Sequence, residues 1–348
     1  MTSFTKDELE RYKGHSPLPH FGQEGQLKLK NARVLCVGCG GLAATAAIYL
    51  AAAGVGTLGL VDADLVSVSN LQRQILFGSA DVGLKKAEVL ARKIADLTPH
   101  VHLETYPVML SADNAETLIS QFDLILDCTD TFPAKYLINE VCFRLKKPFV
   151  YASVFQFEGQ VCFFDGQDGP CFQCLAPIPP APGLSGPCSE VGILGALPGM
   201  MGTMQAIEAV KYIVGLGEML QSKLFFIDTL TQAAKTFSFK KSDACPICYP
   251  GKNANPQSIK AITATELAER RDAVYLIDVR EPAEHAETNI GGHLIPLASL
   301  ESRLAGLDKT KAIVVYCRRG PRSQQAAKIL MDHGFQDVAY LAGGIEPQ

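Results

Sequence analysis

A glycine-rich turn between an apolar segment and an alanine-rich segment most strongly constrains the fold of this 348-residue chain. Residues 34–37 predict a short strand, residues 45–53 a helix, and residues 58–61 a second strand. The turn between the first strand and the helix contains three glycines, Gly38, Gly40 and Gly41. Such glycines let the backbone approach phosphate groups, and the N-terminus of the following helix adds partial positive charge. The pattern therefore predicts a strand–turn–helix–strand unit that binds a nucleotide.

Acidic and basic residues beyond the turn narrow the choice of nucleotide. Asp62 follows Gly40 at the distance where a carboxylate can bind ribose hydroxyls. Arg73 and Lys86 add two cations, and Asp130 ends a later predicted strand at the same carboxyl edge of the sheet. Two cations with a carboxylate suit a triphosphate and its magnesium ion, whereas hydride transfer needs none of them. We therefore predict ATP with Mg²⁺; the alternatives are an NAD oxidoreductase, a structural turn or a solvated charged face.

The elements predicted after this unit alternate between helices and strands. Helices are predicted at residues 82–97 and 191–214, the second broken near Pro198. Further strands are predicted at residues 124–126, 148–152, 160–164, 224–228 and 233–239. This alternation is typical of an α/β fold with a Rossmann-like mixed sheet and helices on both faces. Residues 176–187 carry five prolines and predict a loop.

The composition changes at residues 250–257, which are rich in Pro, Gly and Asn and predict a linker. The alternating pattern then restarts, with helices predicted at residues 263–271 and 323–333 and strands at 274–279 and 312–316. We therefore predict an N-terminal domain of residues 1–249 and a small α/β domain of residues 258–348.

Four cysteines occur as two Cys-x-x-Cys pairs, Cys171 with Cys174 and Cys245 with Cys248. Four thiolates with this spacing match a closed tetrahedral Zn²⁺ site. The ion would tie the segment after the last predicted strand to the body of the N-terminal domain. Four unliganded core thiols or a redox-active pair are the alternatives.

Another cysteine, Cys317, lies in a basic loop between a predicted strand and a predicted helix. Its loop contains Arg318, Arg319, Gly320, Arg322 and Ser323. Loop amides, the helix dipole and three guanidinium groups would favour a thiolate and an anionic persulfide at this cysteine. We therefore predict that Cys317 is a nucleophile; the alternative is an ordinary cysteine in a solvated basic turn.

The bulk properties exclude several classes of partner. A net charge of −4 gives no reason to expect nucleic acid binding. The longest apolar run, residues 191–204, is too short to span a bilayer, and the polar N-terminus does not read as a signal peptide. We expect a cytoplasmic protein that binds neither nucleic acid nor membrane. The other thiols outside the loops are expected in the core: Cys36, Cys39, Cys128, Cys142 and Cys162.

Residues 38–41, 62–64, 69–74 and 127–130, with the two cysteine pairs, resemble the MoeB/ThiF family, bacterial relatives of ubiquitin-activating enzymes. The resemblance implies a homodimer that adenylates the C-terminal glycine of a small ubiquitin-like sulfur carrier ending in Gly-Gly. Arg73 and Asp130 would act in adenylation, and Asp130 would hold Mg²⁺. The resemblance implies that the nucleotide is bound by Asp62, Asp64, Asn70, Arg73, Gln74 and Lys86. Cys188 matches a cysteine that related proteins use for acyl transfer; the alternative is an unreactive loop thiol.

Residues 317–323, together with 278–281 and 342–345, resemble a rhodanese domain. The resemblance implies that Cys317 carries a persulfide and that Arg318, Arg319 and Arg322 bind the sulfur donor or stabilise its charge. The donor would be a cysteine desulfurase or thiosulfate. The persulfide would attack the carrier adenylate and lead to a thiocarboxylate, which could serve molybdopterin, thiamin, cysteine or tRNA thiolation.

Four positions depart from the MoeB/ThiF pattern, which has Arg, Gly, Asn and Arg where this chain has Gly14, Ala43, Thr131 and Lys135. Lys13 or His15 could stand in for the arginine that is missing at position 14. One alternative hypothesis is a degenerate activating domain that only binds a carrier or partner beside an active rhodanese domain. A tRNA-modifying dehydratase is another, and the rhodanese-like segment argues against it.

Overall fold

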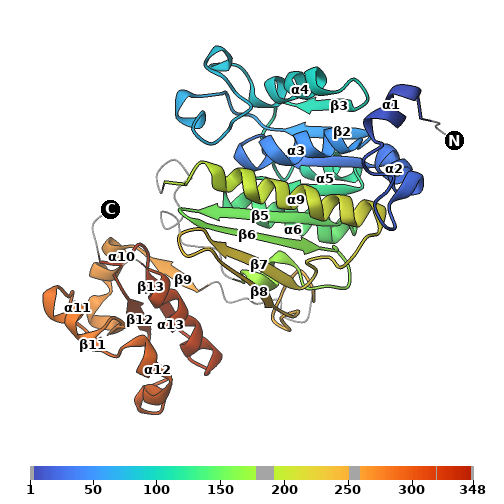
Figure 1. Ribbon diagram of the computed structural model, residues 1–348. Coiled ribbons are helices and arrows are strands. Elements are labelled where there is room, and N and C mark those ends of the chain that lie inside the picture. The colour runs from blue at the N-terminus through green and yellow to red at the C-terminus, as the bar shows by residue number, and fades with distance from the viewer. Residues whose placement is uncertain (1–3, 178–191, 251–258, 319, 346–348) are drawn as a thin grey trace. The chain divides into compact units, whose positions relative to one another are not determined.

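The computed structural model describes residues 4–177, 192–250, 259–318 and 320–345 (Figure 1). These residues form two compact units, which divide close to residue 250. The predicted linker falls almost wholly outside the described residues. Each unit is built around its own sheet.

The sheet of the first unit contains eight strands among the described residues, in the order β3-β2-β1-β4-β5-β6-β7-β8. The first five in this order run parallel, and the last three join by antiparallel pairing. Their bounds are β1 Arg33–Val37, β2 Thr57–Val61, β3 His102–Tyr106, β4 Leu124–Asp127, β5 Phe149–Phe155, β6 Glu158–Phe164, β7 Lys223–Asp228 and β8 Ala233–Ser238.

Helices cover both faces of this sheet because its central strands carry apolar side chains on both sides. Val34 and Cys36 of β1 belong to one hydrophobic cluster, and Leu35 and Val37 belong to another. The first cluster packs under α2 (Gly22–Asn31), α3 (Gly41–Ala53), α4 (Lys86–Leu97) and α9 (Ala196–Val214), and the second under α5 (Ala115–Ser120), α6 (Phe132–Leu145) and α7 (Phe172–Leu175). Figure 1 shows α3 and α9 on one side of the sheet and α5 and α6 on the other. The first helix of the described residues is α1 (Lys6–Arg11).

Several predicted helices have different bounds in the structure. The helix predicted from residue 82 begins at Lys86, after a short 3₁₀ turn, η2 (Ser79–Asp81). The predicted break near Pro198 is wrong, because α9 runs without interruption from Ala196. Proline is tolerated there because first-turn amides have no partner within a helix.

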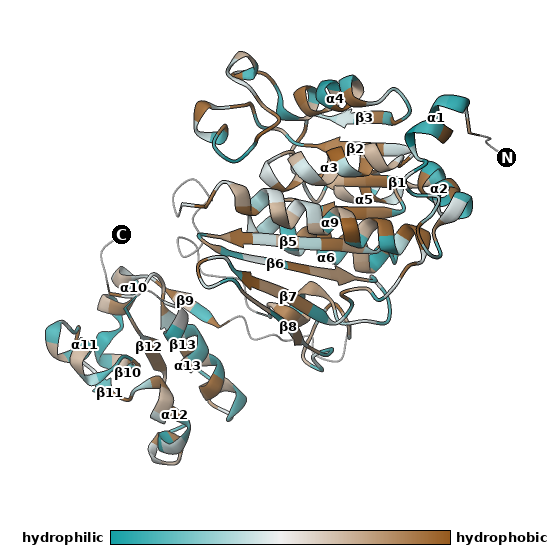
Figure 2. Ribbon diagram, in the orientation of Figure 1, coloured by the Kyte–Doolittle hydropathy of each residue, from teal (hydrophilic) through white to brown (hydrophobic). Residues whose placement is uncertain are grey.

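The second unit has a five-stranded parallel sheet in the order β11-β10-β12-β13-β9 across the described residues. Figure 2 shows its central strand β12 as strongly hydrophobic, whereas α13 carries a mixture of polar and apolar residues. The strands are β9 Lys260–Ile262, β10 Tyr275–Asp278, β11 His293–Leu294, β12 Ile313–Tyr316 and β13 Val338–Leu341. The α-helices are α10 Ala264–Glu269, α11 Pro282–Glu287, α12 Leu297–Arg303 and α13 Pro321–Asp332, and the 3₁₀ turns of the chain also include η1 Val68–Asn70, η3 Arg271–Ala273 and η4 Leu304–Gly306.

The predicted fold class is confirmed: a large mixed sheet with helices on both faces is followed by a small α/β unit. Within the described parts of the chain, no helix combines the length and the apolar character needed to cross a membrane.

Candidate nucleotide, metal and sulfur-transfer sites

A cavity of about 270 Å³ opens at the carboxyl edge of the parallel strands in the first unit. Parallel strands end at one edge, so loops that are distant in sequence meet there. The cavity brings together nearly all of the predicted nucleotide ligands: Gly38, Gly40, Gly41, Asp62, Asp64, Arg73, Gln74, Lys86 and Asp130. Asn70 is the predicted ligand that does not line it.

Two of the glycines are required by the backbone itself. Gly38 has φ +90°, and a Cβ there would come within 2.8 Å of the Cys128 carbonyl oxygen. A Cβ on Gly41 would come within 2.8 Å of Pro198 and 3.0 Å of the Arg73 carbonyl oxygen. The loop therefore packs against β4, α9 and the segment around Arg73, and helix α3 begins with its free amides at the cavity.

The acidic residues after β2 are held by the backbone and by a lysine. Asp62 accepts hydrogen bonds from the amides of Cys39 (2.7 Å) and Asp64 (2.8 Å). Burial raises the pKa of Asp62, although both amides oppose the shift. The buried Lys86 donates to the exposed carboxylate of Asp64 (2.8 Å). This pairing places an ammonium group at the cavity beside the predicted ribose carboxylate.

The segment after η1 positions a second cation and an amide. Asn70 Oδ1 accepts from the Ser67 amide (3.3 Å), and the Asn70 carbonyl accepts from the amides of Arg73 (3.0 Å) and Gln74 (2.9 Å). Asn70 thus shapes this turn. The side-chain oxygen of Gln74 is buried and has no hydrogen-bond partner among the described residues, although Gln74 lines the cavity. A buried acceptor of this kind is expected to have a partner, which a bound ligand could supply.

A buried ion pair supports the loop that carries Asp130. Lys135 Nζ lies 3.2 Å from Asp127 Oδ2 and donates to the carbonyls of Thr129 (2.8 Å) and Ala152 (3.0 Å). Thr129 also donates its amide and hydroxyl to Asp127. Asp130 itself is exposed at the cavity. Lys135, which departs from the family pattern, therefore stabilises the loop of Asp130 through buried contacts.

Two other residues that depart from the family pattern lie close to the cavity or in the helix that begins there. Ala43 is fully buried in α3, and Thr131 lines the cavity as the N-cap of α6. Lys13 pairs with Glu10, and His15 Nδ1 lies 2.8 Å from Gln26 Oε1.

The sequence reasoning missed several residues that line the cavity. The segment after β3 contributes Val108, Met109 and Leu110, and β5 contributes Ser153. Recognising β3 as a parallel strand would have placed the segment that follows it at this edge.

The two predicted cysteine pairs form one cluster. The distances between Sγ atoms are 3.9 Å for Cys171–Cys174, 3.4 Å for Cys171–Cys245 and 3.5 Å for Cys174–Cys248, and all four sulfurs lie within 4.8 Å of one another. A tetrahedral ion with Zn–S bonds of about 2.3 Å keeps its sulfurs roughly 3.8 Å apart. The amide of Ser242 also points at Cys174 Sγ (3.4 Å). The geometry and the donor set therefore fit a metal ion. The five cysteines expected in the core are all buried.

In the second unit, Cys317 follows β12 and is almost fully buried. Its Sγ accepts a hydrogen bond from the Gly320 amide (3.0 Å) and lies 3.5 Å from Ser323 Oγ. Ser323 Oγ donates to the Gly320 carbonyl (2.7 Å), which closes the loop. The amide of Ile345 donates to the carbonyls of Cys317 and Arg318, so the predicted glycine motif at residues 342–345 ends against this loop.

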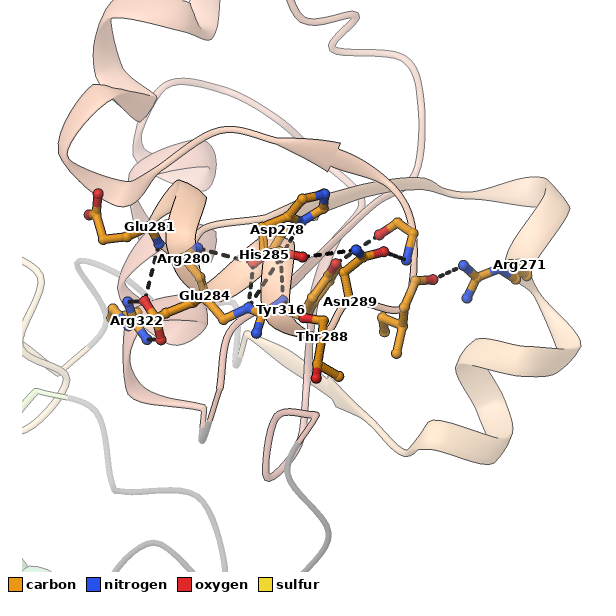
Figure 3. Close-up of polar contacts among 12 residues, drawn as sticks. Arg271, Asp278, Arg280, Glu281, Glu284, His285, Thr288, Asn289, Tyr316 and Arg322 are labelled. Carbon is orange, nitrogen blue, oxygen red and sulfur yellow. Dashed lines mark hydrogen bonds and ion pairs between the residues drawn. The ribbon is translucent and has the colours of Figure 1, made fainter.

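A network of charged side chains lies beside the loop (Figure 3). Asp278 is fully buried, accepts three side-chain hydrogen bonds from Arg280 (2.7–3.1 Å), and lies 2.8 Å from His285 Nδ1. Burial favours the neutral acid, but these hydrogen bonds outweigh it, so the pKa of Asp278 is lowered. Arg322, at the start of α13 just after the cysteine loop, forms an ion pair with Glu284. Cys188 and Arg319 lie outside the described residues.

The sequence profile of the ThiF family matches residues 12–247. The chain belongs to the ThiF family. A profile of the rhodanese-like domain matches residues 263–347. The predicted order of a MoeB/ThiF-type region followed by a rhodanese domain is confirmed.

Two of the relatives extend over almost the whole chain. The probable adenylyltransferase/sulfurtransferase MoeZ of Mycobacterium tuberculosis is 38% identical over 366 residues, covering 99% of this chain and 93% of that protein. The adenylyltransferase and sulfurtransferase MOCS3-1 of Zea mays is 35% identical and covers 99% and 82%. The sulfur carrier protein adenylyltransferase of Thermus thermophilus is 42% identical over 250 residues, 70% of this chain and 92% of that protein. Among solved structures, E. coli MccB with MccA-N7isoASN has the same fold, with a TM-score of 0.59 at 22% identity over 65% of this chain and 69% of that one.

Proposed function

We propose that this protein uses ATP to adenylate the C-terminal glycine of a ubiquitin-like sulfur carrier protein and then transfers sulfur to it from a persulfide on Cys317. The observation that carries the proposal is the cavity, which gathers the glycine turn, two cations and three carboxylates at one sheet edge. The names of the relatives, which include a sulfur carrier protein adenylyltransferase, support the same chemistry.

The first step is attack of the carrier carboxylate on the α-phosphorus of ATP, which releases pyrophosphate and leaves an acyl-adenylate. Asp62 would bind the ribose, and Gln74 would accept a hydrogen bond from the nucleotide. Arg73 and Lys86 would neutralise phosphate charge, and charges fixed in place before the reaction lower the barrier without reorganising. Asp130 would hold Mg²⁺, which when bound neutralises part of the phosphate charge. The chain contributes position and charge and forms no covalent bond in this step.

The second step is attack of the Cys317 persulfide on the acyl-adenylate, which releases AMP and joins carrier and enzyme through an acyl disulfide. A second thiol then attacks the Cys317 sulfur of that disulfide, which frees the thiocarboxylate and leaves an enzyme disulfide. Cys188 is the candidate for this thiol, or for a thioester that forms earlier. The Gly320 amide and the N-terminus of α13 would stabilise the anionic persulfide.

The cysteine cluster would hold Zn²⁺ in a structural role, because four thiolates leave no open coordination position.

We further propose a cytoplasmic homodimer that pairs through α3 and α9. Large apolar side chains are exposed on these helices, namely Tyr49, Met200 and Ile207. Thr131 lines the cavity and Lys135 supports the loop of Asp130, which supports an active adenylation site over a degenerate one.

The test is carrier-dependent exchange of labelled pyrophosphate into ATP, measured with candidate carriers that end in Gly-Gly. Exchange that disappears in Asp130→Ala would establish adenylation and identify the carrier. A folded, zinc-loaded protein that gives no exchange with any carrier would contradict the first step and favour a binding role for the first unit.

A further inference from the structure

Arg322, which follows the cysteine loop at the start of α13, already forms an ion pair with a carboxylate. Arg322 Nη1 donates to Glu284 Oε2 and Nη2 donates to Glu284 Oε1, both at 2.6 Å (Figure 3). Two parallel charge-assisted hydrogen bonds are the strongest geometry open to a guanidinium group. Each side chain keeps only part of its surface exposed, 35% for Arg322 and 23% for Glu284. Arg322 therefore points its fork at α11.

Glu284 is also held in place by contacts of its own helix, α11. Its Oε2 accepts a hydrogen bond from the Glu281 amide (3.1 Å), which caps the first turn of α11. The next residue, His285, anchors the same helix to the buried Asp278. The Arg322 hydrogen bonds are the main cause that lowers the pKa of Glu284 to about 2, so this carboxylate stays ionised at neutral pH. The ion pair is thus a fixed contact between α11 and the start of α13, next to the cysteine loop.

The sulfur of Cys317 receives its hydrogen bonds from other groups. The Gly320 amide donates to Sγ, and the Ser323 hydroxyl lies 3.5 Å away. An anionic persulfide can therefore be stabilised by the backbone and the helix dipole while Arg322 remains bound to Glu284.

We propose that Glu284 is a specificity-determining residue for the sulfur donor, because it withdraws the charge of Arg322 from the space where a donor approaches Cys317. This inference rests on the proposed sulfur transfer. It predicts discrimination against small oxyanion donors such as thiosulfate. With thiosulfate, the Cys317 thiolate attacks the outer sulfur, the sulfur–sulfur bond breaks, and sulfite leaves with the electron pair. The donor and the leaving sulfite both carry two negative charges, so they gain most from a free guanidinium group. A thiol-borne persulfide leaves as a thiol and gains less.

The experiment compares four forms of the intact chain: wild type, Glu284→Gln, Glu281→Gln and Glu284→Gln combined with Arg322→Gln. Glutamine at 284 keeps an oxygen for the Glu281 amide and loses the charge. The control Glu281→Gln removes the same charge from the same helix start without breaking the ion pair. Thiocyanate formation from thiosulfate and cyanide gives KM and kcat for the donor.

We expect the KM for thiosulfate to fall about tenfold in Glu284→Gln, the scale of one freed charge-assisted contact, with a smaller change in kcat. Glu281→Gln should stay within about twofold of wild type, and adding Arg322→Gln should remove the gain. A purely structural role for Glu284 would lower kcat and leave no gain in KM. Equal KM values in Glu284→Gln and Glu281→Gln, or a gain that survives in the double variant, would overturn the proposal.

A binding measurement separates this inference from the proposed function. Inorganic sulfate is an unreactive dianion, and its dissociation constant by calorimetry should also fall about tenfold in Glu284→Gln. Tighter sulfate binding without thiocyanate formation in any form would refute sulfur transfer from thiosulfate to Cys317 and retain the role of Glu284 in excluding anions. If Glu284→Gln does not fold, Arg322→Lys replaces it. Lysine lacks the fork that matches a carboxylate, so it should bind sulfate more tightly than wild type. Unchanged sulfate affinity in every folded variant would contradict the proposal.

Discussion

Replacing Lys135 by methionine tests whether the buried ion pair supports the loop of Asp130. Lys135 is 3% exposed, and the substitution removes the countercharge of Asp127 together with the donor to two carbonyls. Breaking a buried pair on one side costs about 3–5 kcal/mol because a charge is left uncompensated. Asp127 keeps two hydrogen bonds from Thr129, so we expect the lower end, about 3 kcal/mol.

The assay is urea unfolding followed by circular dichroism, fitted as two transitions because the chain has two compact units. The matched control is Lys147→Met, since Lys147 is half-buried and its ammonium group donates a hydrogen bond to the Phe122 carbonyl (2.6 Å). The control should cost about 1 kcal/mol. Combining Lys135→Met with Asp127→Asn should cost less than the sum of the two single changes, because the unpaired charge is gone. A loss in Lys135→Met no greater than in the control would refute the reasoning.

Three further predictions concern the metal, the nucleotide and pH. Metal analysis should find zinc in wild type and in Cys142→Ala but much less in Cys174→Ser, since Cys174 belongs to the cluster and Cys142 does not. Gln74→Met should weaken ATP binding about tenfold in calorimetry with little change in melting temperature, because its buried oxygen has no partner within the described protein. The lowered pKa values of Asp278 and Glu284 stabilise the second unit above their ordinary range, about pH 4, and this stability is lost as pH falls toward 2. Melting curves should show a shallower decline below pH 5 in Glu284→Gln, and an unchanged slope would contradict the assignment.

The central strands were predictable because their apolar runs are continuous. β1, β2 and β4 are buried on both faces, so helix and loop are poor alternatives for such short segments. β3 was missed because it lies at the sheet edge and carries His102 and Glu104. α6 was missed for a different reason. Its sequence mixes aromatic and β-branched residues with Pro133, so its helical pattern is weak, and packing against the sheet decides its structure.

The glycines and most of the charged residues of the cavity were predictable, but their partners were not. Parallel strands bring their carboxyl ends to one edge whatever lies between them, so motifs at strand ends identify the cavity residues. A partner in another element depends on tertiary packing. Arg322 and Glu284 are 38 residues apart and belong to different helices. The loop sequence alone therefore places three arginines near Cys317, but it does not reveal the ion pair of Arg322 with Glu284.

One helix joins the nucleotide cavity to the cysteine cluster, so the proposed zinc ion would stabilise more than its immediate surroundings. α6 begins at the cavity, and its Lys135 holds the loop of Asp130. One turn further on, Asn139 Oδ1 accepts a hydrogen bond from the Phe172 amide (2.7 Å), beside the first cysteine of the cluster. Tyr136 donates to the Ala176 carbonyl (2.7 Å), just before the segment that leads to Cys188. Because Asn139 is fully buried, the helix and the cluster cannot shift independently without breaking this contact. An ion that fixed the four cysteines would therefore also fix the helix that supports the loop of Asp130.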